Sequence, residues 1–274
     1  MPKSLENKHI LITGACGQLG REHAKAVAQE GATPVLLDLD AQKLENFKEE
    51  LQASFNNSPL TLTCDITSEV EITNRANELV KQTGKLDGLI NNAANNPRLN
   101  EEGQVTEGSR LENFSLESWQ ADLSVGLTGS FLCTKYFGHL IAKNPNGGSI
   151  VNISSDLGII GPKQNLYRKD HLPQEQQPVK PVTYSVVKTG LIGLTRYTAT
   201  YWAANKVRCN ALCPGGVYNN RLPDAFVKKL CEEIPLERMA DKDEYHGAIV
   251  FLCSDDSRYM TGSVLSIDGG RTCW

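Results

Sequence analysis

Residues 13–20 read TGACGQLG, and they join a short apolar segment, His9–Thr13, to a segment with helical periodicity, Gln18–Glu30. Glycines at this spacing permit a tight turn, a close approach of the backbone to a phosphate, and close packing of a helix on its strand. The free N–H groups at the start of such a helix attract an anion. The pattern therefore predicts a strand, a turn and a helix that together hold the pyrophosphate of a dinucleotide. The expected contacts are Gly14, Gly17, Gln18, Leu19 and Gly20.

Short apolar segments and helix-period segments alternate along the rest of the chain. Strands are predicted at His9–Thr13, Thr33–Asp38, Leu60–Asp65, Leu86–Asn91, Ser149–Ser154, Val207–Leu212 and Val264–Asp268. Helices are predicted at Gln18–Glu30, Ala41–Ala53, Glu69–Gln82, Leu116–Ala142, Val182–Ala204 and Asp243–Cys253. Such alternation gives right-handed crossovers, so it predicts a mainly parallel sheet of about seven strands with helices on both faces. We expect a single α/β, doubly wound Rossmann domain over residues 1–274, although the length alone would permit two domains.

Composition excludes several classes of function. The formal net charge of −4 disfavours nucleic acid as a partner, because phosphate binding needs clustered Lys and Arg. No segment approaches the roughly 18 apolar residues of a membrane span. The polar N-terminus has no signal-peptide pattern, so we expect a cytoplasmic protein that binds a small molecule. The eight cysteines form no C-x-x-C pair and the five histidines lack metal-ligand spacing, so we expect unpaired thiols and no metal site.

Asp38 ends the second predicted strand. A carboxylate at this position can accept hydrogen bonds from both ribose hydroxyls of an adenosine, and it repels the 2′-phosphate of NADP. The glycine turn contains no Lys or Arg that would offset this repulsion. The sequence therefore predicts NAD in preference to NADP. Asp38 could instead cap the next helix, but Asp40 stands closer to that helix and can take the capping role.

Tyr184 and Lys188 stand near the start of the helix predicted at Val182–Ala204. Residues at positions i and i+4 share one helix face, so the phenol and the ammonium group point the same way. A nearby cation favours the phenolate and lowers the pKa of a tyrosine from about 10. Ser154 and Ser155 stand at the end of the fifth predicted strand, where a hydroxyl can hold a carbonyl oxygen. A tyrosine, a lysine and a serine hydroxyl in these places predict a general acid/base centre.

These motifs, in this order, resemble the short-chain dehydrogenase/reductase family from about Leu5 to Asp268. The segments that carry the resemblance are Thr13–Gly20, Asp38, Cys64–Thr67, Asn91–Ala94, Ser155, Tyr184 with Lys188, Asn210, Pro214–Gly215 and Asp268–Gly270. The resemblance implies that Tyr184 is the general acid/base, that Lys188 lowers its pKa and binds the nicotinamide ribose, and that Ser155 positions the substrate oxygen. Ser155 is preferred to Ser154 because it stands three residues before a glycine, Gly158. The resemblance also implies cofactor contacts at Asp65, Ile66, Asn91, Asn92, Ala93, Tyr184, Lys188, Pro214, Gly215 and Val217.

The chain departs from the family pattern at Gly126. Family members have an Asn at this position, seven residues after the aromatic residue that Trp119 matches, and this Asn helps to hold a water that relays protons from the lysine. The departure puts the relay in doubt and leaves the Tyr–Lys–Ser chemistry intact. Ser124, Thr128 or backbone groups could hold the water instead.

Two loop segments, 93–114 and 161–181, follow the carboxyl ends of predicted strands, and we expect them to form the rim of the active site. The second lies between Ser155 and Tyr184, which stand much further apart than is usual in the family. This insertion looks most like that of flagellin-modification oxidoreductases from nonulosonic-acid and amino-sugar pathways. The likeness implies hydride transfer between a nicotinamide and a secondary alcohol or ketone of a sugar-like molecule from surface-glycan biosynthesis. Polar candidates on the rim are Asn95, Asn96, Arg98, Tyr167, Arg168, Lys169 and Asn219.

Two other functions stay open. The spacing T-G-x-x-G-x-x-G in the turn resembles the sugar-nucleotide branch of the family, which suggests an epimerase or dehydratase that retains NAD. Gly126 in place of the family Asn would also suit a catalytically idle dinucleotide-binding protein.

A homodimer or homotetramer is also implied by the resemblance, with the two long helices as the usual contact. Apolar residues that suit this contact are Leu191, Ile192, Leu194 and Tyr197, although they could instead only face the sheet. Aromatic residues expected in the core or between subunits are Trp119, Phe131, Tyr136 and Phe137.

Overall fold

The computed structural model describes residues 3–55, 57–95 and 108–274. These residues form a seven-stranded sheet in the order β3-β2-β1-β4-β5-β6-β7, and every pair of neighbouring strands is parallel. The strands are β1 (His9–Thr13), β2 (Thr33–Asp38), β3 (Leu60–Thr63), β4 (Gly88–Asn91), β5 (Gly148–Ile153), β6 (Val207–Pro214) and β7 (Val264–Ile267). The predicted α/β fold is confirmed. The strand order reverses between β1 and β4, which is where doubly wound sheets bind their ligands.

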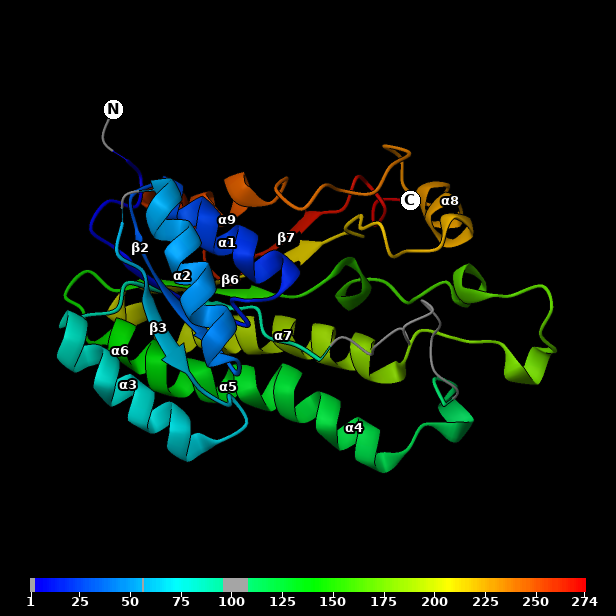
Figure 1. Cartoon of the computed structure of the whole chain (residues 1–274), viewed down its shortest axis with the longest axis horizontal. Coiled ribbons are helices and arrows are strands. Elements are labelled where there is room, and N and C mark those ends of the chain that lie inside the picture. Colours follow the sequence, from blue (N-terminus) through cyan, green and yellow to red (C-terminus); the bar gives the residue numbers. More distant parts are fainter. Residues whose placement is uncertain (1–2, 56, 96–107) are drawn as a thin grey trace.

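Helices cover both faces of the sheet (Figure 1). One face carries α1 (Gln18–Gln29), α2 (Ala41–Phe55) and α9 (His246–Cys253). The other carries α3 (Glu69–Thr83), α4 (Leu116–Leu123), α5 (Ser130–Cys133), α6 (His139–Ala142) and α7 (Val182–Tyr201). Successive strand residues point to opposite faces, so Ile12 joins the core under the first group and Leu11 the core under the second. Both side chains are fully buried.

Local signals set the ends of the helices near the site. Asp40 caps α2, because its Oδ1 accepts hydrogen bonds from the backbone N–H groups of Gln42 (3.1 Å) and Lys43 (3.0 Å). The Ser68 hydroxyl accepts from the Glu71 N–H group at the start of α3. Capping by Asp40 frees the Asp38 side chain at the tip of β2 for other partners.

The structure corrects several predicted elements. The helix predicted at Leu116–Ala142 is interrupted by two π-helical segments, Ser124–Gly129 and Thr134–Gly138. A helix that was not predicted, α8 (Asp224–Cys231), lies beside the segment 161–181 at one end of the molecule (Figure 1). β3 ends at Thr63, two residues before its predicted end, and α9 begins at His246 rather than Asp243.

The predicted subunit face is wrong in part. Leu191 and Ile192 are buried within the chain, because α7 packs them toward the sheet, whereas Tyr197 on the same helix is 65% exposed. Phe137 belongs to the core, while Phe131 is 49% exposed. All eight cysteines are free, and no helix of the described residues is long and apolar enough to cross a membrane.

Candidate active site

A cavity of about 900 Å³ opens at the carboxyl ends of the central strands. Its lining includes Gly14 after β1, Asp38 at the tip of β2, Asn92 after β4, Ser155 after β5 and Pro214 at the end of β6. The cavity therefore runs along the edge where the strand order reverses, and one side of it is closed by the segment 161–181 and α8.

The glycine turn lies against one end of this cavity. Gly14 has a φ of +62°, and a Cβ there would lie 2.9 Å from the Ala93 Cα. A Cβ on Gly20 would lie 2.1 Å from the Gly14 carbonyl oxygen, so Gly20 allows α1 to pack onto the turn without lining the cavity itself. The other predicted contacts, Gly14, Gly17, Gln18 and Leu19, do line it. This cradle, followed by the N-terminus of α1, fits the pyrophosphate of a dinucleotide.

The adenosine end is formed by the tips of β2 and β3. The Asp38 carboxylate accepts hydrogen bonds from the backbone N–H groups of Cys16 (2.9 Å) and Leu39 (2.8 Å) and faces the cavity. Asp65 and Ile66 also line it, as predicted. Lys43 lines it too and was not predicted. Its ammonium group pairs with Asp40 at 3.0 Å.

The two asparagines after β4 have different roles. Asn92 lines the cavity with Ala93, and its Nδ2 donates to the Thr13 carbonyl oxygen at 2.9 Å, which ties β4 to the glycine turn. Asn91 is buried and does not line the cavity. Its Nδ2 donates to Asn152 Oδ1 (2.8 Å) and Thr134 Oγ1 (3.0 Å). The Asn91 side chain thus joins β4 to β5 and to the second π-helical segment, and the predicted cofactor contact by Asn91 remains a prediction.

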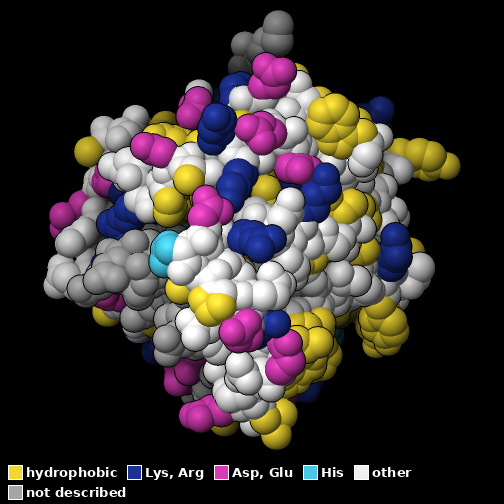
Figure 2. All heavy atoms as spheres, turned by 90° about the vertical axis from the view of Figure 1, so that its right-hand side faces the viewer, with side chains coloured by type: hydrophobic (Ala, Val, Ile, Leu, Met, Phe, Trp, Pro, Cys, Tyr) yellow, Lys and Arg dark blue, Asp and Glu magenta, His cyan; other side chains and the backbone are white. Residues whose placement is uncertain are grey.

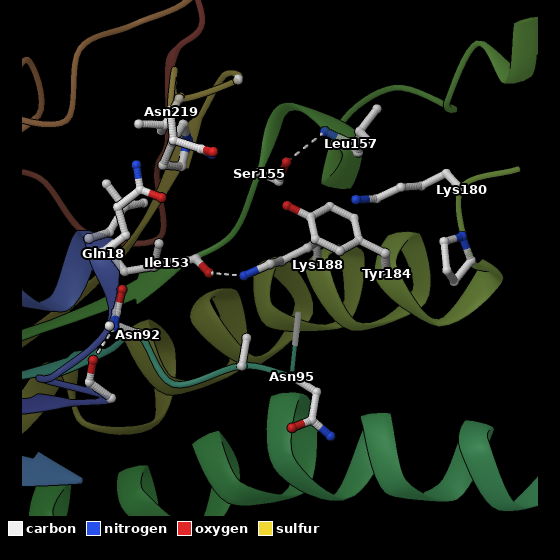
Figure 3. A pocket seen from close by; sticks show the side chains of 18 of the residues that line it. Gln18, Asn92, Asn95, Ile153, Ser155, Leu157, Lys180, Tyr184, Lys188 and Asn219 are labelled. Carbon is white, nitrogen blue, oxygen red and sulfur yellow. Dashed lines mark hydrogen bonds between the residues drawn. The ribbon is translucent and has the colours of Figure 1, made fainter. Parts of the chain in front are cut away.

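Tyr184, Lys188 and Ser155 converge on the other end of the cavity (Figure 3). Tyr184 and Lys188 project from the same face of α7. The Lys188 ammonium group donates to the Ile153 carbonyl oxygen at 2.8 Å, which holds it beside the end of β5. Ser154 Oγ donates to the Lys188 carbonyl oxygen at 2.7 Å, whereas Ser155 Oγ lies within hydrogen-bond reach of the Tyr184 hydroxyl. The predicted choice of Ser155 agrees with this geometry.

Burial changes the pKa values of Tyr184 and Lys188. It raises the pKa of Tyr184 above its usual value, while the nearby Ser155 hydroxyl acts in the opposite direction. Burial, and to a lesser extent the neighbouring Lys180 ammonium group, lower the pKa of Lys188 to about 8. Bringing an anionic partner into the cavity would therefore favour the charged form of the lysine.

A buried ion pair contacts the Ser155 hydroxyl, and the sequence did not indicate it. Asp156 Oδ1 accepts a hydrogen bond from Ser155 Oγ at 2.7 Å, and its Oδ2 accepts from Arg271 at 2.5 Å. Asp156 is 3% exposed and Arg271 is 7% exposed. Arg271 follows the turn Asp268–Gly270, so the end of the chain after β7 returns to the active site.

Gly126 is explained by its packing. A Cβ at this position would lie 2.5 Å from Val187 Cγ1, because the π-helical segment brings the backbone close to α7. A small hollow nearby is lined by Asn95, Asp122 and Thr183 as well as Gly126 and Lys188. Ser124 and Thr128, which were expected to replace the missing Asn, do not line this hollow.

Replacing Gly126 with Asn is expected to destabilise the protein by about 1–3 kcal/mol, the usual cost of overpacking a core. Val187 must move, and it precedes Lys188 on α7. Urea unfolding measures the change, and Gly126→Asn combined with Val187→Ala is the control, because the smaller side chain makes room. An unchanged unfolding midpoint in the single variant would contradict this account of Gly126.

The inserted segment 161–181 folds into a compact loop that reaches the cavity. The buried Gln177 side chain closes it, accepting from the Lys169 N–H group at 2.8 Å and donating to the carbonyl oxygens of Lys169 (2.8 Å) and Leu172 (2.5 Å). The rim candidates that line the cavity are Asn95, Tyr167, Arg168, Lys169 and Asn219. Asn96 and Arg98, with most of the first rim loop, lie outside the described residues. Lys180 lines the cavity beside Tyr184 and was not predicted.

Comparison with known proteins gives matches along almost the whole chain. A family model described as short chain dehydrogenase matches residues 8–167, and one described as enoyl-(acyl carrier protein) reductase matches residues 174–272.

Two curated relatives and one solved structure have informative names. Trans-4-hydroxycyclohexanecarboxylate dehydrogenase of Sinomonas cyclohexanicum is 33% identical, over 97% of this chain and 93% of that protein. Post-translational flagellin modification protein A of Campylobacter coli is 29% identical, over 97% and 98%. A crystal structure of NAD⁺-bound xylitol dehydrogenase has a TM-score of 0.83 and 26% identity, covering 98% of this chain and 100% of that one.

Proposed function

The chain belongs to the short-chain dehydrogenase/reductase family, and from this premise we propose that it transfers a hydride between NAD and a secondary alcohol or ketone of a hydroxylated, sugar-like compound. The family comprises oxidoreductases that use a nicotinamide cofactor. The observation that carries the proposal is the meeting of Tyr184, Lys188 and Ser155 at one end of a cavity whose other end is the glycine turn.

Ser155, Tyr184 and Lys188 each have a separate role at the reacting oxygen. In the direction of oxidation, the Ser155 hydroxyl holds the substrate oxygen and the Tyr184 phenolate removes its proton. Lys188, held by the Ile153 carbonyl oxygen, supplies the positive charge that stabilises this phenolate. A nicotinamide bound in the cavity would supply the hydride acceptor. In the direction of reduction, Tyr184 returns the proton, so both directions use the same three groups.

A sugar-like substrate is supported by the polar rim and by the names of similar proteins. Asn95, Arg168 and Asn219 line the cavity and can bind hydroxyl groups. One relative is named for flagellin modification, one for a hydroxylated cyclohexane ring, and one structural neighbour for a polyol. We infer a role in surface-glycan biosynthesis from the first of these names together with the insertion.

The substrate proposal is tested by following NADH absorbance with a panel of sugars, amino sugars, nucleotide sugars and apolar ketones. Turnover of hydroxylated substrates with stoichiometric NADH release supports a dehydrogenase. Reaction of apolar ketones alone would overturn the sugar-like substrate. Interconversion of sugars without NADH release would indicate an epimerase or dehydratase, and NAD binding without any turnover would indicate an idle dinucleotide-binding protein.

We propose NAD rather than NADP as the cofactor because the Asp38 carboxylate faces the cavity where an adenosine ribose would lie. Asp38→Ala is expected to lower kcat/KM with NAD by about tenfold or more, the value of a charge-assisted hydrogen bond. It should raise kcat/KM with NADP, because Lys43 remains near the 2′-phosphate without the opposing carboxylate.

Steady-state kinetics with NAD and with NADP measure the ratio of the two kcat/KM values. Asp38→Asn is the matched control, because an amide oxygen can still accept from the Cys16 N–H group and keep the turn in place. Asp38→Asn should also narrow the preference for NAD over NADP, because it removes the negative charge of the carboxylate. An unchanged ratio in both variants would contradict the role of Asp38.

We further propose a cytoplasmic homodimer or homotetramer. The free cysteines suit a reducing compartment. Exposed aromatic side chains on the helices of one face suit a subunit contact. They are Phe131, Tyr197 and Tyr201. Light scattering that shows a monomer would overturn the oligomer.

A further inference from the structure

Lys180 brings an additional positive charge to the catalytic tyrosine. Its ammonium nitrogen lies 3.7 Å from the centroid of the Tyr184 ring, whereas that of Lys188 lies 5.8 Å away. The Lys180 backbone N–H group donates to Gln164 Oε1 at 2.9 Å, and Pro181 follows as the cap of α7. Figure 3 shows the Lys180 side chain pointing into the space that Tyr184 and Ser155 face. Its position is therefore set by the inserted segment on one side and by α7 on the other.

The surrounding wall has an excess of positive charge. Its basic residues are Arg168, Lys169, Lys180, Lys229 and Arg271, and its acidic residue is Asp156. Asp156 pairs with Arg271 and also accepts from Ser155. Among the residues that the structure describes, no carboxylate forms an ion pair with Lys180. The outer surface at this end mixes Lys and Arg with Asp and Glu (Figure 2), so the excess belongs to the cavity.

A neutral substrate would leave this lysine in an unfavourable state. Removing an ammonium group from water is costly unless an anion compensates it. Burial lowers the pKa of Lys180 to about 8, and the attraction of Asp156 opposes this only in part. The ring of Tyr184 offers a cation–π contact, which is weaker than a carboxylate partner.

We propose that the substrate carries an anionic group, a carboxylate by preference, and that Lys180 binds this group beside the reacting carbon. The inference rests on the proposed hydride transfer and specifies its substrate class. Because Lys180 lies over the ring whose hydroxyl handles the reacting oxygen, the anion must stand close to the alcohol, as in an α- or β-hydroxy acid or an acidic sugar. Lys180 is then a specificity-determining residue that the insertion supplies.

The test compares substrate pairs that differ in their anionic group. The pairs are lactate with lactamide, β-hydroxybutyrate with its methyl ester, galactonate with galactitol, and glycerol phosphate with glycerol, each measured with NAD. In the pair that is turned over fastest, we expect the anionic compound to have a higher kcat/KM than its neutral counterpart. Preference confined to glycerol phosphate would overturn the carboxylate and identify the anion as a phosphate.

Lys180→Met should reduce the acid-to-neutral ratio of kcat/KM by about tenfold to a hundredfold, mostly through KM, since one charge-assisted hydrogen bond is lost. Lys180→Arg should keep a larger acid-to-neutral ratio than Lys180→Met, because it retains a positive charge. Lys163→Met is the control, because Lys163 belongs to the same segment but is exposed and pairs with Glu233. A ratio unchanged by Lys180→Met, or a preference of the wild-type enzyme for the neutral partners, would overturn the proposal.

A binding measurement separates this proposal from the proposed function. If no compound turns over, hydride transfer to these substrate classes fails, and malonate is titrated into the enzyme–NADH complex while NADH fluorescence is followed. Tighter malonate binding by the wild-type protein than by Lys180→Met would still support the anion site. Equal binding would overturn it.

Discussion

Tyr184→Phe is expected to lower kcat by about 10²- to 10⁴-fold, the range for loss of a general acid/base. The variant keeps the ring that packs beside Lys180 and Lys188 and removes only the hydroxyl that exchanges a proton with the substrate. Steady-state kinetics measure the loss. NADH binding, followed by fluorescence, should change little, since we assign the remainder of the cofactor to the glycine turn and the tip of β2.

Tyr167→Phe is the matched control for this experiment. Tyr167 lines the same cavity, but its ring packs on Phe226, with 5.5 Å between the ring centroids, and it belongs to the inserted segment. Its hydroxyl is not placed in the proton transfer, so we expect a much smaller change in kcat than for Tyr184→Phe. Full turnover by Tyr184→Phe, or equal losses in both variants, would contradict the assignment of Tyr184 as the general acid/base.

Arg271→Met is expected to lower the free energy of unfolding by about 3–5 kcal/mol, the cost of removing one partner from a buried ion pair. The variant leaves the Asp156 carboxylate buried without its cation. Asp156 also positions the Ser155 hydroxyl, so kcat should fall together with stability. Urea unfolding and steady-state kinetics measure the two effects.

Two further variants make this prediction specific. In Asp156→Leu combined with Arg271→Met, both charges are replaced by apolar groups, so much of the stability should return although Ser155 loses its partner. Arg238→Met breaks an exposed pair with Glu244 and should cost little, because exposed ion pairs are screened by water. Equal unfolding free energies for wild type and Arg271→Met would show that the buried pair contributes nothing to stability.

The parts of the fold and site that the sequence predicts correctly are those with local signals. Each strand is a short apolar run bounded by polar residues or glycine, and the turn 13–20 has Gly14 and Gly20 at positions where a Cβ would collide. Tyr184 and Lys188 meet because one helix turn separates them. Ser155 is found by its place at the end of a strand.

Other features depend on contacts between distant segments, and no local pattern marks them. Asp156 and Arg271 meet only because the chain returns to the sheet edge after β7. Lys180 reaches Tyr184 through the fold of a loop, and the orientation of Asn91 follows from its partners on β5 and in the second π-helical segment. The π-helical segment that brings Gly126 against Val187 has no sequence pattern of its own, so the missing Asn could be seen but not explained.

The hydrogen bonds of Gln177 close part of the inserted segment on itself, while Leu166 and Tyr167 pack it against α8. The groups to which we assign the proton transfer stand on α7 and after β5, whereas Lys180 and the neighbouring basic residues stand in or beside the segment 161–181. We therefore expect selectivity to change by mutation or replacement of this segment and α8 while the catalytic framework stays as it is. In engineering terms, residues 161–181 and α8 together form an exchangeable cassette. Grafting both into a relative with a shorter connection should transfer the preference for acids, provided that Gln177 is carried along.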